Sequence, residues 1–278
     1  MSGRILIAGG KSDPSIGAIH DAARRLGVET MNLWTDTATI TFDPLTVKLW
    51  QDAHEVTGIA AAFHRADVFG TGIISVAAVL RGWLACNPAI RRLNPLKFGR
   101  SASVNKLSAL AAAHRHGLAI PLTMAGNDPR ALAAFAAQAP AIRKPVEGGD
   151  YCRPLVAEAV TEAMAIIAQE RLVGPEMRIY RVGGKLFGFH IRSNALDYRT
   201  DQTAVVSPTP VPEDIGLALT ALTDEMGLDF CASDFKTCPR SGIWVYLETN
   251  AAPMIAAFGP ELAEAIVAHL ISPLVSRV

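Results

Sequence analysis

Metal-binding oxygens are concentrated near the end of the sequence, on the side chains of Asp234, Glu248 and Asn250. Glu248 and Asn250 are two residues apart, so they share one face of an extended strand. Lys236 stands in the same relation to Asp234, where it either contacts a phosphate or substrate or is solvated. Carboxylate and amide oxygens are the ligands that Mg²⁺ takes beside phosphates. If the two segments pair, the spacing predicts a magnesium site with a lysine beside it.

A β-hairpin must position these side chains. The pattern predicts strands at Phe230–Thr237 and Ile243–Thr249, joined by a turn at Pro239–Gly242. The alternative is that the polar positions form the solvated face of a two-sided hairpin, which period-two alternation also requires. Glu248 and Asn250 end the most apolar strand of the hairpin, where an unpaired charge is costly, and this favours the metal interpretation.

Composition excludes some classes of protein. The 26 basic and 26 acidic residues cancel, which argues against general nucleic-acid binding. No apolar run reaches the roughly eighteen residues of a membrane span. The start MSGRILIAGG lacks a charged-then-apolar leader, so we expect a cytoplasmic protein. The 4 cysteines show no zinc-site spacing and are expected to be reduced core thiols.

Residues 1–95 alternate between strand and helix, which predicts a small α/β layer with a mostly parallel sheet. The expected strands are Arg4–Ala8, Glu29–Trp34, Ala38–Phe42 and Ile59–His64, and the expected helices are Pro14–Leu26 and Ile73–Cys86. Gly9-Gly10 after the first strand suggests a dinucleotide loop, but the full GxGxxG pattern and its acidic residue are missing. His64 and Arg65 end a strand, so Arg65 is either a cation at the carboxyl edge of the sheet, where ligands commonly sit, or a surface loop residue.

A linker-like segment, Asn94–Arg100, precedes a second α/β pattern. We expect a helix from the N-cap Asn105 to about His116, with its buried side formed by Leu107, Leu110, Ala111 and His114. Next come a strand at Leu118–Thr123, a helix at Arg130–Ala137 and a strand at Ala141–Val146. Lys144 lies in that last strand, before the turn Glu147-Gly148-Gly149-Asp150, whose backbone N–H groups can approach a phosphate. The alternative is an ordinary solvated lysine.

The rest of the chain is expected to form more strands and two helices. The expected strands are Met164–Gln169, Met177–Val182 and Lys185–Arg192, and the helices are Glu213–Met226 and Glu261–Ile271. Glu176 and Arg178 share a face where the second of these strands begins. A polar loop after the third strand contains Arg199.

The order of these motifs resembles the ATP-grasp carboxylate-amine ligases, from about Phe63 to Phe258. The motifs are Asn105-Lys106-Leu107, Lys144, Gln169-Glu170, Glu176-x-Arg178, Arg199, Asp234 and Glu248-x-Asn250. The chain is most similar to the branch of ribosomal-protein glutamate ligases and microviridin-type (graspetide) peptide ligases. The resemblance implies an α/β (α+β) protein of ATP-grasp fold. It implies a pre-ATP-grasp domain over 1–95 and an ATP-grasp module over 96–278, divided into a lid at about 101–172 and a metal-binding core at about 173–278.

The resemblance also implies a role for each matching residue. The phosphates of ATP would be held by Lys106, Lys144 and the loop Glu147, Gly148 and Gly149, and adenine would be held by Gln169, Glu170, Arg171 and Leu172. Ribose would lie near Glu176, and one or two Mg²⁺ ions would be bound by Asp234, Glu248 and Asn250. The γ-phosphate and the acceptor carboxylate would be bound by Arg178 and Arg199. Arg65 would be a candidate for substrate contact. The sequence departs from many relatives in 147–153, which is not a plain Gly/Ser-rich run.

The implied reaction activates a carboxylate as an acyl phosphate and joins it to an amine, or less often a hydroxyl, on an amino acid or peptide. Such a reaction depends on positioning and charge neutralisation, which the basic residues and Mg²⁺ would supply. The sequence leaves a homodimer open, and it leaves two alternatives: a nucleotide-binding regulatory protein without catalysis, or a Rossmann-like protein that binds NAD or a sugar.

Overall fold

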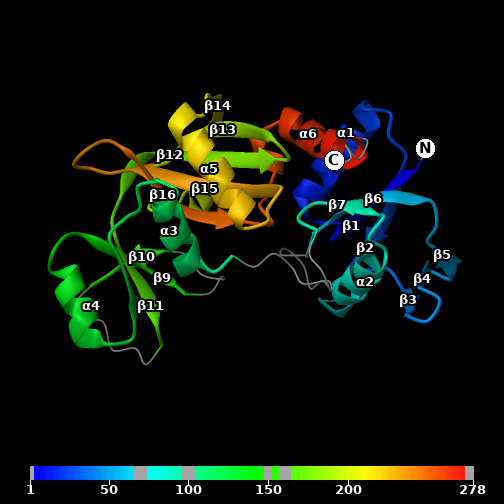
Figure 1. Cartoon of the computed structure of the whole chain (residues 1–278), viewed down its shortest axis with the longest axis horizontal. Helices are drawn as coiled ribbons and strands as arrows, with labels where there is room; N and C mark the ends of the chain where they lie inside the picture. Colours follow the sequence, from blue (N-terminus) through cyan, green and yellow to red (C-terminus); the bar gives the residue numbers. More distant parts are fainter. Residues whose placement is uncertain (1–2, 66–73, 96–103, 147–151, 157–163, 273–278) are drawn as a thin grey trace.

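The computed structural model describes residues 3–65, 74–95, 104–146, 152–156 and 164–272. Three main sheets lie along the long axis of the molecule in Figure 1, and the first and last described elements, β1 (Arg4–Gly9) and α6 (Pro260–Ile271), are on the same side. Within the described residues, no helix combines the length and the apolar character needed to cross a membrane. The turn Glu147, Gly148 and Gly149 lies outside the described residues.

The parallel sheet is formed by the amino-terminal segment. Its strand order is β2-β1-β6-β7, and its strands are β1 (Arg4–Gly9), β2 (Thr30–Trp34), β6 (Ile59–His64) and β7 (Arg91–Arg92). Helix α1 (Pro14–Arg25) packs on one face and α2 (Ile74–Cys86) on the other. Helix α1 begins where Asp13 Oδ1 accepts a hydrogen bond from the Ser15 amide at 2.8 Å. The predicted parallel α/β layer is therefore confirmed.

One expected strand of this layer belongs elsewhere. The segment predicted at Ala38–Phe42 is β3 (Ile40–Asp43), which pairs with β4 (Lys48–Gln51) in a separate antiparallel sheet completed by β5 (His54–Glu55). The β3–β4 turn has no glycine, which is why the hairpin was not expected. The Asp43 carboxylate holds the turn instead, accepting from the Leu45 amide at 2.9 Å and the Thr46 hydroxyl at 2.6 Å.

The small antiparallel sheet has the order β10-β9-β11-β8. Its strands are β8 (Thr123–Gly126), β9 (Ala141–Pro145), β10 (Arg153–Pro154) and β11 (Ile166–Glu170), and α4 (Pro129–Ala136) covers one face. The strand expected at Leu118–Thr123 was wrong, since ladder pairing starts only at Thr123. Pro121 lies inside the expected strand and has no N–H to donate.

The large sheet has five strands in the order β14-β13-β12-β15-β16. They are β12 (Val173–Val182), β13 (Lys185–Arg192), β14 (Val205–Thr209), β15 (Phe230–Thr237) and β16 (Trp244–Asn250). Helices α3 (Lys106–Arg115) and α5 (Glu213–Glu225) pack on one face, while α6 (Pro260–Ile271) and α1 contribute to the core on the other. The predicted β15–β16 hairpin is confirmed (Figure 1).

Helix α3 buries a different side from the one expected. Its buried residues are Ala109, Leu110, Ala112 and Ala113, whereas Ala111 and His114 are exposed. Alanine occupies 4 of the 10 positions of the helix, on more than one side, so the apolar period does not fix its rotation. Packing against α5 and β16 decides it instead.

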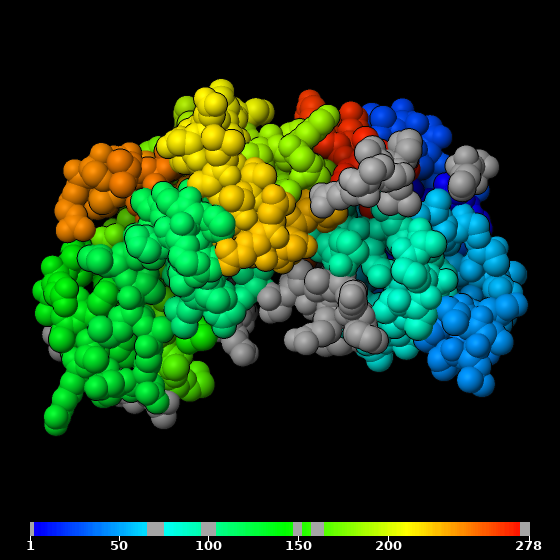
Figure 2. All heavy atoms as spheres, in the orientation of Figure 1, coloured from blue at the N-terminus to red at the C-terminus, as the bar shows by residue number. Residues whose placement is uncertain are grey.

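Asn94 connects the parallel sheet to the large sheet. Its side-chain oxygen accepts from the amides of Asp229 at 3.0 Å and Phe230 at 2.9 Å. Its side-chain nitrogen donates to the carbonyls of Phe230 at 2.6 Å and Ala251 at 3.0 Å. The backbone of Asn94 is left-handed, with φ of 48°, which asparagine tolerates better than most residues. In the space-filling view of Figure 2, the amino-terminal part of the chain and the part that contains the large sheet are in contact.

We expect Asn94→Ala to lower the free energy of unfolding by about 2–4 kcal/mol, because four hydrogen bonds of a partly buried amide are lost. Asn94→Gly should lose nearly as much, although it relieves the backbone. Urea denaturation measures both. Asn87→Ala is the matched control, since the Asn87 side-chain amide donates only to the Trp83 carbonyl. Equal losses of unfolding free energy in the two alanine variants would contradict the role of Asn94 in connecting the two sheets.

Candidate active site

A row of charged residues crosses the centre of the large sheet. Arg178 of β12 is the register partner of Asp234 in β15, and Asp234 is in turn the partner of Glu248 in β16. Directly opposed residues share a face, so the two carboxylates stand side by side. The register shifts just after Asp234. The sequence prediction that Asp234 and Glu248 converge is therefore confirmed.

Arg178 and Asp234 form a buried ion pair. One guanidinium nitrogen lies 3.1 and 3.2 Å from the two carboxylate oxygens, and the side chains are 7% and 12% exposed. Burial raises the pKa of Asp234, and Arg178 opposes that effect. Burial disfavours the charge of Arg178, but Asp234 and two tyrosines more than offset it and raise the pKa of the guanidinium. The two groups are thus held together at the centre of the site.

Aromatic groups complete the surroundings of Arg178. The Tyr198 hydroxyl accepts a hydrogen bond from its Nη1 at 2.7 Å. The rings of Tyr180 and Phe258 lie 5.4 and 5.5 Å from the guanidinium carbon, which is within cation–π range. The Nε atom is buried with no hydrogen-bond partner among the described residues. Arg178 is therefore a fixed cation whose Nε is a donor without a partner in the described part of the chain.

Lys236 pairs with Glu176 one step along the same face. The ammonium lies 3.2 Å from Glu176 Oε2 and donates to the Leu196 carbonyl at 2.9 Å, and the lysine side chain is 15% exposed. Lys236 is thus not in bulk solvent, and it shares the Asp234 face as its strand position predicted. Burial raises the pKa of Glu176 to about 7, although Lys236 lowers it.

Two lysines approach this face from separate elements. Lys106 begins α3, which Asn105 caps through the amides of Leu107 and Ser108. Its ammonium lies 3.8 Å from Glu248 Oε2 and donates to the Pro145 carbonyl at 3.4 Å. Lys144 lies in β9; burial lowers its pKa, and Glu248 partly offsets this. The two predicted phosphate lysines therefore meet beside Glu248.

Arg199 lies on a short 3₁₀ helix, Tyr198–Thr200. Asp197 caps that helix and binds the guanidinium at 2.5 and 2.8 Å, and the arginine side chain is 52% exposed. Asp197 and Tyr198 were not expected in the site, although Asp197 holds Arg199 and Tyr198 holds Arg178. The Asp-x-Arg spacing before a short helix was the available signal for Asp197; Tyr198 had none, because its contact is with a residue 20 positions away.

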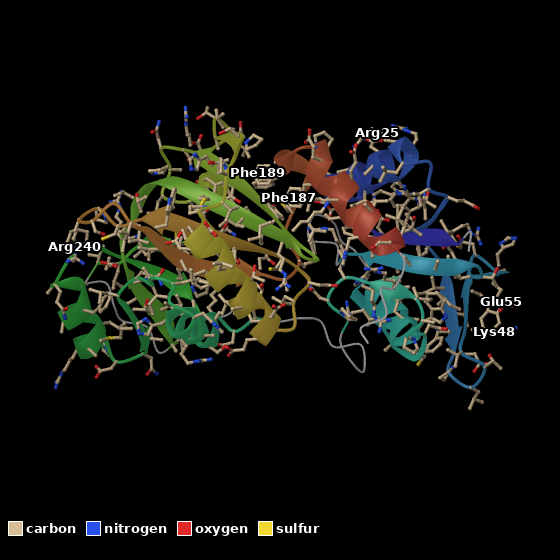
Figure 3. All side chains as sticks on the ribbon, turned by 45° about the horizontal axis from the view of Figure 1, so that its top comes forward. Arg25, Lys48, Glu55, Phe187, Phe189 and Arg240 are labelled. Atoms are coloured by element: carbon tan, nitrogen blue, oxygen red, sulfur yellow. The ribbon has the colours of Figure 1, made fainter. Side chains whose placement is uncertain are left out.

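The strand β11 presents Gln169 and Glu170 to opposite sides. Gln169 and Lys144 lie on the face away from α4, and Gln169 is 1% exposed with its Oε1 unpaired among the described residues. Its amide nitrogen donates to Thr123 Oγ1 at 3.0 Å. Glu170 accepts from the Leu122 amide at 3.1 Å and pairs with Arg240 at 3.2 Å. Arg240 extends from the β15–β16 turn in Figure 3. The Glu170 carboxylate is therefore already engaged.

Arg65 does not take the place expected of a substrate contact. It is 5% exposed and pairs with the buried Asp13 at 2.7 Å. It also donates to the carbonyls of Ala252 and Pro253, just beyond Asn250. The guanidinium thus connects the parallel sheet to the end of β16 and is not exposed to a ligand.

Comparison with solved structures identifies the fold. The chain aligns with the Chryseobacterium gregarium RiPP-associated ATP-grasp ligase in complex with ADP and a leader and core peptide, with TM-score 0.77, 19% identity and 98% of each chain covered. The macrocyclase MdnC of Microcystis aeruginosa, bound to precursor peptide MdnA, gives TM-score 0.75 and 20% identity over 96% of this chain and 99% of that one. The ATP-grasp ligase PsnB, complexed with minimal precursor, Mg and ADP, gives TM-score 0.74 and 19% identity over 96% of this chain and 98% of that one.

The chain has the ATP-grasp fold. No protein-family model matches it, and no curated protein matches it by sequence. At 18–20% identity to the peptide-modifying ligases, the likeness is one of structure. The fold inferred from the motif order is confirmed.

The groups of this ATP-grasp chain fit a nucleotide and a hard metal ion. The buried, unpaired Oε1 of Gln169 is an acceptor that needs a donor such as an adenine amino group. Asp234, Glu248 and Asn250 supply an all-oxygen donor set; the Asn250 oxygen also accepts from the Ala252 amide at 2.9 Å. No three His, Cys, Asp or Glu side chains are grouped to hold a metal in the described part of the chain, so the proposed set depends on the Asn250 oxygen.

The raised pKa of Glu176 predicts a pH-dependent stability. The unfolded carboxyl ionises near 4.5 and the folded one near 7, so the folded state holds more protons across that window and its stability falls as pH rises. As pH rises from about 5 to about 8, we expect the free energy of unfolding of Glu176→Gln to increase by about 2–3 kcal/mol relative to that of wild type.

Urea denaturation in EDTA measures this difference. Glu225→Gln is the control, because hydrogen bonding from His116 and the charge of Arg115 lower the pKa of that exposed carboxyl. The same pH dependence in both variants would contradict the assignment.

Proposed function

We propose that the chain is an ATP-dependent carboxylate-amine ligase. It transfers the γ-phosphoryl group of ATP to a substrate carboxylate, and an amine of an amino acid or peptide then displaces phosphate to form an amide bond. One observation carries this proposal: Lys106 and Lys144, from two elements, meet beside Glu248 and Asp234 on one face of the large sheet. A triphosphate needs cations and metal-binding carboxylates together in this way.

The proposed roles follow from position and charge. Lys106 and Lys144 bind the phosphates, and Gln169 with the backbone of Glu170, Arg171 and Leu172 holds adenine. Glu176 lies toward the ribose, while Asp234, Glu248 and Asn250 hold Mg²⁺, which would neutralise phosphate charge when bound. We assign the reacting carboxylate and γ-phosphate to Arg178, Arg199 and Lys236. Arg suits planar oxyanions, and Arg178 is already fixed by Asp234 and Tyr198.

The chemistry explains the predominance of positive groups. A carboxylate and a triphosphate repel each other, so the site must cancel charge before they can react. Burial strengthens each of these interactions, because water is excluded. Arg178 is buried and Lys144 is half-buried, and both interact electrostatically with Asp234.

A peptide is the substrate that the fold comparisons favour. The three ligases of similar fold are complexed with a leader and core peptide, a precursor peptide or a minimal precursor. We propose a peptide or amino acid substrate and a cytoplasmic reaction. We also propose the division into an amino-terminal domain over 1–95 and an ATP-grasp module over 96–278.

Nucleotide binding is the first expected result. Mg-ATP should raise the melting temperature, because at a hundredfold excess over Kd it adds about 2.7 kcal/mol to the free energy of unfolding. NAD should leave the melting temperature unchanged. Lys106→Met and Lys144→Met should weaken the shift. Lys185→Met, an exposed lysine at the start of β13, is the control. Stabilisation by NAD alone would favour the dinucleotide-binding alternative.

Turnover is the second expected result. A screen of amino acids and peptides should give ADP release, with products lighter by one water than the sum of the reactants by mass spectrometry. Glu248→Gln and Asp234→Asn should lower ADP release about 100-fold or more, since charge stabilisation is lost. Glu225→Gln is the surface control. Undiminished turnover by a folded Asp234→Asn would overturn the metal assignment.

A further inference from the structure

A loop between β13 and β14 reaches the charged row of the large sheet. It comprises residues 193–204, between Arg192 and Val205, which are paired with each other at the ends of the two strands. Its central part forms the 3₁₀ helix Tyr198–Thr200. The loop therefore extends from one side of the sheet to a site whose other residues lie on β12, β15 and β16.

Three cations of the proposed reaction site are linked to this loop. The Leu196 carbonyl accepts a hydrogen bond from Lys236 of β15 at 2.9 Å. The Tyr198 hydroxyl accepts from Arg178 of β12 at 2.7 Å, and the third cation, Arg199, belongs to the loop itself. Because Lys236 and Arg178 come from different strands, the position of the loop affects how both of them lie relative to Arg199.

One carboxylate holds the two ends of the loop together. Asp201 Oδ2 accepts hydrogen bonds from the Ser193 hydroxyl at 2.6 Å and the Asn194 amide at 3.3 Å, just after β13. Its Oδ1 accepts from the amide and the hydroxyl of Thr203 at 2.8 and 2.6 Å, just before β14. The hydrogen bond from Ser193, followed by those from Thr203, lowers the pKa of Asp201 to about 2, so the carboxylate is charged near pH 7.

The backbone connects this carboxylate to the groups that contact the cations. The Asp201 amide donates to the Tyr198 carbonyl at 3.0 Å. On the other side, the Ser193 hydroxyl oxygen accepts from the amide of Ala195, the residue before Leu196, at 3.1 Å. Both oxygens of the Asp201 carboxylate are engaged by donors of the loop, so its effect on the site passes through the loop.

We propose that Asp201 is a positioning residue, which holds the 193–204 loop in the conformation that places the three cations around the reacting carboxylate. Without its four hydrogen bonds the loop would sample more conformations, and the cations would be less well placed before the reaction. This role rests on the proposed ligase function. Nucleotide binding should not depend on it, because Lys106 and Lys144 lie on α3 and β9.

Turnover by the full chain tests this role, with the peptide that gives the most ADP release in the screen as substrate. Asp201→Ala should lower kcat about tenfold or more, because small displacements of catalytic groups are costly. The Kd of Mg-ATP, measured by thermal shift, should be unchanged. Asp201→Asn keeps one acceptor oxygen, so its kcat should lie between those of the alanine variant and wild type. It also provides the test if Asp201→Ala does not fold.

Amide hydrogen exchange without nucleotide, followed by mass spectrometry, tests the loop itself. Exchange over residues 194–204 should be several-fold faster in Asp201→Ala than in wild type. Asp43→Ala is the matched control, since Asp43 likewise accepts from an amide and a hydroxyl, in the β3–β4 turn. It should change neither the kcat nor the exchange of residues 194–204.

Three results would overturn the role of Asp201: unchanged exchange over residues 194–204 in Asp201→Ala, wild-type kcat in that variant, or a loss of kcat matched by weaker Mg-ATP binding or by an equal loss in Asp43→Ala. Failure of this role alone therefore appears as wild-type turnover by a variant whose loop exchanges faster. Failure of the ligase function appears as no ADP release by wild type with any peptide, and the positioning role then falls with it.

Discussion

The site depends on one buried ion pair, Arg178 with Asp234, at the centre of the large sheet. Taking both charges out of water costs several kcal/mol per ion, and their attraction does little more than offset this cost. The pair is therefore poorly explained as a source of stability. Its effect is positional: it orients Asp234 toward Glu248 across β15 and β16, and it fixes a cation beside them. Removing either partner would leave the other charge buried and unpaired.

The neighbouring residues continue this pairing of basic with acidic side chains. Glu176 and Lys236 repeat the acid–base pairing one step along β12 and β15, and Lys106 and Lys144 add positive charge beside Glu248. Burial is the first cause of the raised pKa of both Asp234 and Glu176, so these two carboxyls lie in a buried part of the site. Such a site gives electrostatic interactions their greatest effect on a reaction between two anions.

Sequence reasoning located the hairpin and its charged face because strand alternation is a local rule. It could not give the buried side of α3, since an alanine-rich helix has no strong apolar period, nor the start of β8, where Pro121 interrupts the ladder. It also misjudged Arg65, whose partners Asp13 and Pro253 are 52 and 188 residues away in sequence. Local pattern constrains a residue's face, but the partner that faces it is set by tertiary packing.

The small antiparallel sheet meets the large sheet through few strong contacts. Lys106 of α3 donates to the Pro145 carbonyl of β9 at 3.4 Å, and Glu170 of β11 lies 3.2 Å from Arg240, whose side chain is 70% exposed. An exposed ion pair of this kind contributes about 0–1 kcal/mol, so it does not lock the two sheets. Helix α3, by contrast, packs within the core of the large sheet and carries Lys106 with it. A triphosphate bound by both Lys106 and Lys144 would therefore supply the missing attraction, and closure over the substrate would follow from nucleotide binding.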